Sequence, residues 1–344
     1  MSKGNWLKER IPLNIEGISA LLFKEEIPVH MKKWLFAMGT TPFILFPLQI
    51  LTGALLAVYY IPSTEMAYES VRYITEDLQM GFWVRGIHHW GAHLMIISLF
   101  LHMMRVFFTH SYRKPREINW IFGFILLFLT LAISFTGYSL TYNQLSFWAA
   151  TVGTNLIQGV PVIGEFLLRM IRGGEDVGIN TLTRFYSLHV WLLPIFITIL
   201  IGVHIVLIRM HGISIPKGFK KESYNFYPGH MYKIIIVTLF LLSVLSLLAV
   251  ILPPGLGDKA DPLNTPLHIK PEWYFFPVFL FLKWVPLSFG MLITGLAIIG
   301  MVFWPFIEPL FSKNEKTRNI ISYITGSLVI LILIIFTLIQ TFTV

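Results

Sequence analysis

Long apolar stretches alternate with shorter polar ones along most of this 344-residue chain. A helix of about 20 apolar residues crosses a bilayer core of about 30 Å, and seven stretches reach that length. They lie near residues 35–60, 86–108, 119–140, 185–208, 232–252, 287–307 and 319–341. The pattern therefore predicts an all-α integral membrane protein, with a bundle of four transmembrane helices followed by three further ones.

Polar stretches divide the predicted protein into four parts. Residues 1–33 form an interfacial segment on the cytoplasmic side, because residues 5–27 have an amphipathic composition; a floppy tail is the alternative. Residues 34–211 form the four-helix domain, and residues 232–344 form the three-helix domain. Residues 212–231 are a polar connecting loop between them.

The composition excludes a soluble enzyme and a nucleic-acid binder. Hydrophobic residues make up 55% of the chain and charged residues 13%, against about 25% charged in soluble domains. The net charge of +8 could suggest a nucleic-acid partner, but the positions of the charges indicate membrane topology instead. The connections on one side hold 18 Lys and Arg against 8 Asp and Glu, and those on the other side hold 8 against 10. The positive-inside rule then predicts a cytoplasmic N-terminus and a C-terminus on the positive side of a bacterial-type inner membrane.

Two connections on the positive side are too long to be plain turns. They run over residues 144–184 and 253–283. Long ordered loops between membrane spans usually carry function, so we expect the two to contribute to a site.

Four histidines lie inside the apolar stretches, where polar residues are costly and usually functional. His88 and His102 are 14 residues apart in the second helix, and His189 and His204 are 15 apart in the fourth. Rotations of about 1400° and 1500° leave each pair within about 40° and 60° of one face, with a rise of about 21–22 Å. The two helices run in the same direction, so the spacing predicts two stacked pairs of facing imidazoles. Such pairs suit haem iron, and interhelical hydrogen bonds or a proton path are the alternatives.

Other histidines fit this pattern less well. His89 and His93 share a helix face and also suit a metal pair, but no carboxylate lies near them in sequence. His89 misses the face of His102 by about 140°, which favours His88 as its counterpart. We expect the remaining histidines near the cytoplasmic surface to be solvated: His30, His110, His211 and His230.

Glycines repeat at the same interval as the histidines. Gly39 and Gly53 in the first helix, and Gly123 and Gly137 in the third, are each 14 residues apart. Glycine allows a flat group to approach the backbone closely, which favours two macrocycles packed against these helices. Close packing between helices at small residues is the alternative.

Arginines flank the four histidines. Arg85 and Arg184 lie just before the positive-side pair, and Arg105 and Arg209 lie just after the negative-side pair. Such residues suit anionic haem propionates, or anchor helices at the membrane interface. The chain has no cysteine, so it cannot hold a disulfide, a thiolate-bound iron–sulfur cluster or a thioether-linked haem.

Several short motifs together resemble one family. They are Arg85-Gly-Ile-His88, Leu101-His102-Met-Met-Arg105, Arg184-Phe-Tyr-Ser-Leu-His189, Gly137-Tyr138, Gln144-Leu-Ser-Phe-Trp148 and Pro271-Glu272-Trp273-Tyr274. They are similar to cytochrome b of the cytochrome bc and plastid-type bf complexes, over residues 33–310. The last motif matches the family's PEWY motif. The 15-residue histidine interval resembles the plastid type, here joined to a part like its three-helix subunit IV.

The resemblance implies a quinol oxidoreductase with two non-covalent b haems. His88 and His189 would hold one haem and His102 and His204 the other. Quinol would be oxidised on the positive side, with one electron passing to a Rieske iron–sulfur protein and the other to the haems. Quinone would be reduced on the negative side, in a Q-cycle coupled to proton translocation. A c-type cytochrome subunit and a homodimeric complex are implied as well.

The same resemblance implies roles for individual residues. Glu272 would accept a proton from quinol in a partly desolvated site, with Tyr138 as a second candidate. A salt bridge from Glu272 to a loop cation is the alternative. The other positions implied at the quinol site are Pro271, Trp273, Tyr274 and Ala149. Arg209 and Lys233 are the candidates at the quinone-reduction side.

The sequence departs from the family at three places. Leu140-Thr141-Tyr142 stands in place of the family's LPW, Ala149 follows Trp148 where other members have glycine, and Ala37 stands where the plastid type has its haem-linking thiol. Two other functions compete with this interpretation. A di-haem anchor of a hydrogenase or formate dehydrogenase would not need the PEWY loop, and a transporter with a histidine proton relay would bind no haem.

Overall fold

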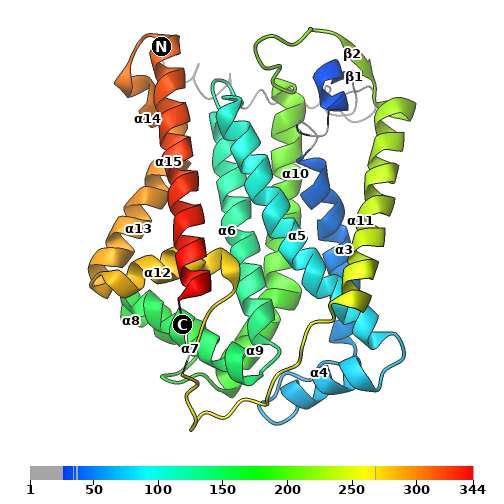
Figure 1. Cartoon of the computed structure of the whole chain (residues 1–344), viewed down its shortest axis with the longest axis vertical. Coiled ribbons are helices and arrows are strands. Elements are labelled where there is room, and N and C mark those ends of the chain that lie inside the picture. Colours follow the sequence, from blue (N-terminus) through cyan, green and yellow to red (C-terminus); the bar gives the residue numbers. More distant parts are fainter. Residues whose placement is uncertain (1–25, 34, 36–37, 268, 344) are drawn as a thin grey trace.

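The computed structural model describes residues 26–33, 35, 38–267 and 269–343. The predicted interfacial helix lies almost wholly outside these residues, as does Ala37. The helices of the described part, labelled as in Figure 1, are α3 (Thr40–Ala57), α4 (Ala67–Glu76), α5 (Gly81–Phe108), α6 (Glu117–Ser139), α7 (Gln144–Gln158), α8 (Gly164–Arg172), α9 (Ile179–Ser187), α10 (Leu193–His211), α11 (Met231–Ile251), α12 (Phe276–Trp284), α13 (Leu287–Val302), α14 (Trp304–Phe311) and α15 (Glu315–Phe342). The short elements are β1 (Glu26–Pro28), β2 (Ser223–Asn225), η1 (Val29–Lys32), η3 (Leu188–Leu192), η4 (Phe226–His230) and η5 (Trp273–Phe275).

Six helical stretches in the described part are long and apolar enough to cross a membrane, and α13 with α14 makes a seventh if the pair is one span. The predicted all-α membrane fold is confirmed. The sixth span is not the straight helix predicted over residues 287–307, because α13 and α14 meet at an angle of 80°. Pro305 lies in the first turn of α14, where a proline suits a new helix and ends the preceding one.

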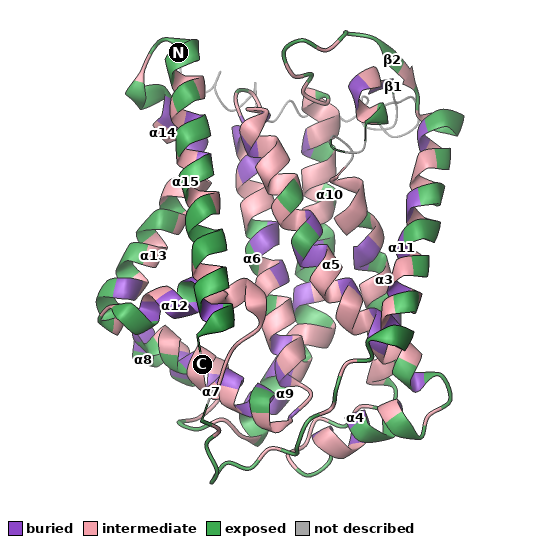
Figure 2. Ribbon diagram, viewed as in Figure 1, coloured by how far each residue is buried: buried purple, intermediate pink, exposed green. Residues whose placement is uncertain are grey.

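The first four spans form one bundle, in which the fourth span is continuous through α9, η3 and α10 (Figure 1). On one side of it, α11 packs against α5 so closely that a Cβ on Gly86 would lie 2.6 Å from the Cβ of Ala249. Small residues at such positions let membrane helices approach each other. On the other side lie α12 to α15, and exposed positions are frequent on α11 and α15 (Figure 2).

The two long connections lie at the same end of the bundle, as expected (Figure 1). The first contains α7 and α8, and the second crosses beneath the bundle from α11 to α12. Hydrogen bonds join them: Asn143 Nδ2 donates to the carbonyl of Leu256 at 2.6 Å, and the backbone N–H of Gln144 donates to the carbonyl of Asp258 at 2.8 Å. Arg85 of α5 adds two bonds, to the carbonyls of Pro254 and Gly255. The second loop is therefore held in place by both α5 and the first loop.

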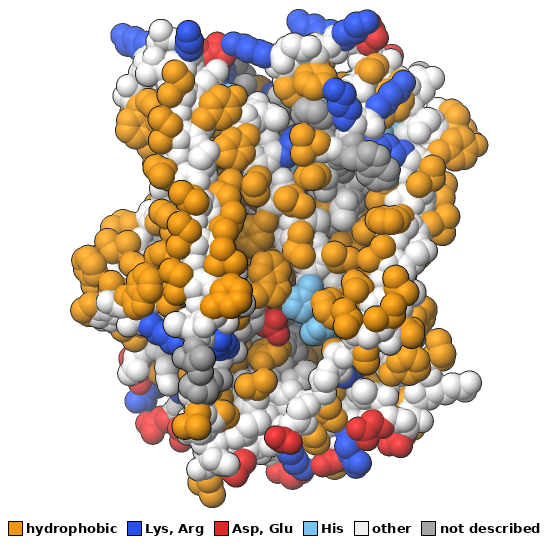
Figure 3. Space-filling model, viewed as in Figure 1, with side chains coloured by type: hydrophobic (Ala, Val, Ile, Leu, Met, Phe, Trp, Pro, Cys, Tyr) orange, Lys and Arg blue, Asp and Glu red, His pale blue; other side chains and the backbone are white. Residues whose placement is uncertain are grey.

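The opposite end of the bundle carries the β1–β2 pair and most of the visible Lys and Arg side chains, while acidic side chains gather at the loop end (Figure 3). The four histidines expected to be solvated at this end are not. His30 and His230 are 4% and 6% exposed, and the Tyr224 hydroxyl lies 2.7 Å from His230 Nδ1. Both ring nitrogens of His110 and of His211 are shielded from solvent. The charge pattern correctly placed these histidines at this end of the bundle, but it could not show that neighbouring side chains shield them.

A buried ionic cluster at this end ties the three-helix part to the bundle. Glu308 of α14 is 1% exposed and accepts hydrogen bonds from both Nε and Nη2 of Arg113, which lies between α5 and α6. Ser322 of α15 donates to the same carboxylate at 2.9 Å, and its hydroxyl lies 3.0 Å from that of Tyr112. The cluster joins three segments, namely α14, α15 and the connection between α5 and α6, and so fixes their arrangement.

We expect Glu308→Gln to lower the thermal stability of the protein, because it removes the buried charge partner of the Arg113 guanidinium and leaves only the exposed carboxylate of Glu315 at 3.9 Å. Removing one member of a buried ion pair typically costs about 3 kcal/mol. The thermal unfolding midpoint of the detergent-solubilised protein measures the effect. The control is Glu165→Gln, which removes an exposed pair with Arg169 on α8 and should change the midpoint much less. Equal midpoints for the two variants would contradict the structural role of the cluster.

Candidate functional site

His88 of α5 and His189 of η3 face each other inside the bundle. Their ring centroids are 6.1 Å apart and their planes are inclined at 76°. Two metal–nitrogen bonds of about 2 Å, plus the two ring radii of about 1 Å, place the centroids of an imidazole–metal–imidazole unit about 6 Å apart. The spacing of this pair therefore fits one metal ion between the rings.

Hydrogen bonds to the neighbouring helices define the tautomer of both rings. His189 Nδ1 lies 2.8 Å from the carbonyl of Ile133 on α6, so it donates a proton there. His88 Nδ1 lies 2.9 Å from the Thr52 hydroxyl on α3. That hydroxyl gives its own hydrogen to the carbonyl of Leu48 at 2.8 Å, so His88 must be the donor. Both rings thus keep a lone pair on Nε2, the atom that binds a metal.

A π-helical turn explains the unequal histidine intervals. Residues 188–192 form such a turn directly at His189, and a π turn holds one more residue than an α-helical turn. The 15 residues from His189 to His204 therefore complete about the same rotation as the 14 from His88 to His102. His189 and His204 therefore lie about as close to one helix face as His88 and His102 do, about 40° apart rather than the roughly 60° expected from the sequence.

Each of the four glycines lies against one of the four histidines. A Cβ on Gly39, Gly53, Gly123 or Gly137 would lie 2.9, 3.1, 3.6 or 2.3 Å from Cε1 of His102, His88, His204 or His189, respectively. The glycines thus make room for the imidazole rings, and the packing of a flat macrocycle against the same helices stays a prediction. The two glycine pairs repeat at the 14-residue interval of His88 and His102 because each glycine lies against one histidine.

His102 and His204 form the second pair, near the opposite end of the same helices. They lie close enough to interact electrostatically. In the described part of the chain neither Nδ1 atom has a hydrogen bond of normal geometry, although His204 faces the backbone of Asn119.

The arginines predicted beside haem propionates have other contacts in this structure. Arg85 bonds the loop carbonyls described above, and Arg184 of α9 donates to the carbonyl of Met170. Arg105 and Arg209 lie in the last turns of α5 and α10, at the depth expected. The flanking arginines therefore mark the ends of the helices, and their role beside haem propionates stays a prediction.

The PEWY residues lie where the second loop enters η5, beside α5 and α6. Glu272 has a side chain that is 20% exposed, and its burial raises the pKa of the carboxyl above its ordinary value. Tyr138 of α6 and Tyr274 are both within electrostatic range of this carboxylate. Pro271 and Trp273 are half-buried, and Ala149 of α7 is 5% exposed. In the structure Glu272 has no Lys or Arg partner among the described ion pairs, which removes support for the salt-bridge alternative.

His93 also belongs to this site, whereas its spacing from His89 in the sequence suggested a metal pair. Trp273 Nε1 donates to its Nδ1 at 2.9 Å, and its Nε2 lies 4.0 Å from Glu272 Oε2. The ring of His89 is 4.6 Å away, but the described residues contain no group of three potential ligands that could hold a metal ion. One sequence signal could have indicated this contact: His93 lies one turn beyond His89, on the helix that borders the loop.

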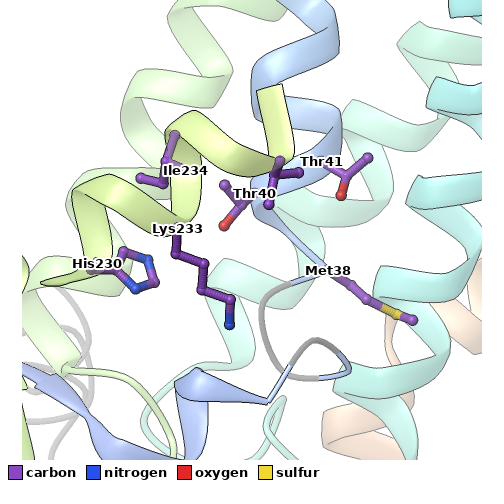
Figure 4. Close-up of a pocket in the computed structure, with 7 residues that line it drawn as sticks. Met38, Thr40, Thr41, His230, Lys233 and Ile234 are labelled. Carbon is purple, nitrogen blue, oxygen red and sulfur yellow. The ribbon is translucent and has the colours of Figure 1, made fainter. Parts of the chain in front are cut away.

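A cavity of about 160 Å³ lies at the opposite end, between the starts of α3 and α11 (Figure 4). Ligand pockets are usually larger, at about 300–1,000 Å³. Lys233 points into this space in Figure 4 and donates to the carbonyls of Met31 and Lys32 at 2.7 and 2.8 Å. Arg209 does not line the cavity, but His230 lies within electrostatic range of both Arg209 and Lys233. The other lining residues are Met38, Thr40, Thr41, Ile234 and Val237.

Comparison with known proteins agrees with this arrangement. The family model described as cytochrome b/b6/petB matches residues 23–212, and the model described as cytochrome b (C-terminal)/b6/petD matches residues 259–343. The chain belongs to the cytochrome b/b6 family. Membership implies b-type haem held by membrane helices, which the imidazole pairs fit.

Individual relatives show how the two parts are joined. The cytochrome bc complex cytochrome b subunit of Chlorobaculum thiosulfatiphilum is 40% identical over 96% of this chain and 78% of the relative. Cytochrome b6 of Heliobacterium mobile is 42% identical over 62% of this chain and 99% of the relative. A chain of the solved hyperthermophilic respiratory Complex III has the same fold, with a TM-score of 0.76 and 24% identity over 98% of this chain and 99% of that chain.

We expect Gly137→Ala to weaken haem binding in this cytochrome, because the new methyl group would displace the ring of His189. Disturbing the residues that orient a metal ligand typically costs about 10–100-fold in affinity. Gly123→Ala is the matched control, since its Cβ would meet His204 at an ordinary contact distance of 3.6 Å. Haem per polypeptide in the purified protein measures both. Equal losses of haem in the two variants would show that the contact between residue 137 and His189 does not control haem binding.

Proposed function

We propose that this cytochrome b is the di-haem subunit of a quinol:cytochrome c, or similar acceptor, oxidoreductase. It oxidises quinol on the positive side of the membrane, with bifurcated electron transfer to a Rieske protein and to two b haems, and it reduces quinone on the negative side. The net reaction is a Q-cycle coupled to proton translocation. The haems, when bound, supply one-electron carriers at two depths of the bilayer.

The observation that carries this proposal is the His88–His189 pair. Its rings are spaced for one metal ion, and their Nδ1 protons are committed to Thr52 and Ile133. A histidine proton relay would need ring nitrogens that exchange protons, whereas these Nδ1 atoms are fixed as donors. The depth of the second pair, His102 and His204, extends the same arrangement toward the other surface.

Glu272 is the proposed proton acceptor for quinol. Its carboxyl lies in a partly buried position beside two tyrosines and an imidazole. Burial raises its pKa toward the working pH, which suits a general base. Pro271, Trp273, Tyr274 and Ala149 are the proposed walls of this site, and Tyr138 a second polar contact. Arg209 and Lys233 remain the proposed residues of the quinone-reduction side.

We also propose the surroundings of the subunit. The excess of Lys and Arg at the β1–β2 end supports a cytoplasmic, negative-side location for that end in a bacterial-type inner membrane. A Rieske protein, a c-type cytochrome and a second copy of the complex are the proposed partners. The proposed division is a haem domain over residues 34–211, a connecting loop over 212–231 and a subunit IV-like domain over 232–344, with residues 1–33 at the interface.

A haem count tests the proposal directly. The purified complex should contain two haems per copy of this chain, both extractable with acid–acetone because the chain has no cysteine. His189→Leu should leave one haem per chain, since it removes one axial ligand of one pair. A folded wild-type protein without haem would overturn the redox function and favour a transporter.

Replacing the base should slow quinol oxidation without loss of haem. We expect Glu272→Gln to lower the rate about 10²–10⁴-fold, the usual contribution of general base catalysis. In the wild type the rate should fall as the pH drops through the raised pKa of Glu272, because the carboxylate becomes protonated. The pH dependence of b-haem reduction by duroquinol measures both effects. A variant with an unchanged rate and pH profile would exclude Glu272 as the acceptor.

A further inference from the structure

His93 of α5 makes two contacts with the PEWY loop, which its spacing from His89 in the sequence does not predict. The indole Nε1 of Trp273 is 2.9 Å from its Nδ1, and Oε2 of Glu272 is 4.0 Å from its Nε2. The side chains of His93 and Glu272 are 15% and 20% exposed. Figure 3 shows histidine and acidic side chains next to each other on the face that carries α5 and α15.

The contact with Trp273 fixes the proton on the His93 ring. An indole N–H only donates hydrogen bonds, so Nδ1 must accept and cannot carry a proton while this bond holds. The neutral ring therefore has its proton on Nε2, the atom that faces Glu272. A doubly protonated ring would place two N–H groups against each other, and the bond to Trp273 thus keeps His93 neutral.

The resulting donor faces the carboxylate of Glu272. A distance of 4.0 Å is too long for a direct hydrogen bond but is suited to a small closing movement or a water bridge. Catalytic hydrogen bonds are often long in the absence of substrate and shorten when it binds. A donor to a carboxylate favours the charged form, which is the form that can accept a proton.

We propose that His93 is a positioning residue for quinol oxidation: through the Trp273 bond it presents Nε2–H to Glu272 and keeps that carboxylate ionised and oriented. This inference rests on the proposed role of Glu272. His93 does not take up the proton in this arrangement, because Nε2 already holds one and Nδ1 is occupied. The proton accepted by Glu272 must leave by another route.

The environment of the pair contains few other titratable groups. In the described part of the chain, those that face His93 or Glu272 are His89 on the same helix, Tyr138 on α6 and Tyr274 in η5. None of them is a permanent cation. His93 is therefore the group whose removal should change the proton affinity of Glu272 most.

The test follows the pH dependence of b-haem reduction by duroquinol in the purified, haem-replete complex. His93→Leu removes the hydrogen-bond donor, which makes the protonated form of Glu272 more stable relative to the carboxylate. The midpoint of the acid limb should therefore move up by about 1 pH unit, a tenfold change in proton affinity. His93→Gln should restore the midpoint, because its amide offers an acceptor to Trp273 and a donor to Glu272. His110→Leu, at the far end of the membrane, is the control and should not shift it.

A second variant tests the tautomer argument and does not depend on the folding of His93→Leu. Trp273→Phe frees Nδ1, so His93 can take up a second proton as the pH falls. The imidazolium would favour the carboxylate, and the midpoint should move to lower pH, opposite to His93→Leu. A shift in the same direction for both variants would overturn the proposal, as would failure of His93→Gln to restore the midpoint.

Glu272→Gln separates this inference from the proposed function. If the acid limb disappears in Glu272→Gln but stays in place in His93→Leu, Glu272 is the acceptor and His93 has no positioning role. If the acid limb persists in Glu272→Gln, the proposed role of Glu272 is wrong and the inference about His93 is wrong with it. Two haems per chain in each variant confirm that the comparison concerns folded protein.

Discussion

The close approach of an imidazole ring to a glycine on the neighbouring helix is the contact on which the bundle depends. It occurs four times, with α3 against α5 and α6 against α10 or η3. A side chain at these glycines would separate the helices or turn the rings. At Gly53 and Gly137 the approach also brings Nδ1 to a hydroxyl or a carbonyl of the same helix. Packing and ligand orientation are therefore set by the same contacts.

The two long loops at one end of the bundle depend on it in turn. Arg85, one turn before His88, holds the second long loop through two carbonyls, and His93, just over one turn beyond, holds the PEWY segment through Trp273. A single helix thus positions one imidazole of the facing pair and two points of a loop that carries an ionisable group. Because these contacts come from residues 85–93 of one helix, a displacement of the loop and a displacement of the imidazole pair are expected to be coupled.

Much of this could be predicted from the sequence, since apolar runs and a residue interval report directly on helices and their faces. The seven predicted spans, the shared end of the two long loops and the common face of His88 and His102 needed no tertiary information. The sequence could not show the π turn at His189, because a single extra residue in a turn has no compositional signature. The burial of His30 and the contacts of Arg85 also follow from tertiary packing. His93 was missed for the same reason, since its partners are about 180 residues away.

The two imidazole pairs differ in what orients their rings. The Nδ1 atoms of His88 and His189 lie within hydrogen-bond distance of protein oxygens, whereas neither Nδ1 atom of His102 and His204 has a normal hydrogen bond in the described residues. A partner at Nδ1 fixes the tautomer and the orientation of an imidazole. Both pairs are also held by the close approach of a glycine to each ring. The first pair is therefore oriented by packing and hydrogen bonding together, and the second mainly by packing.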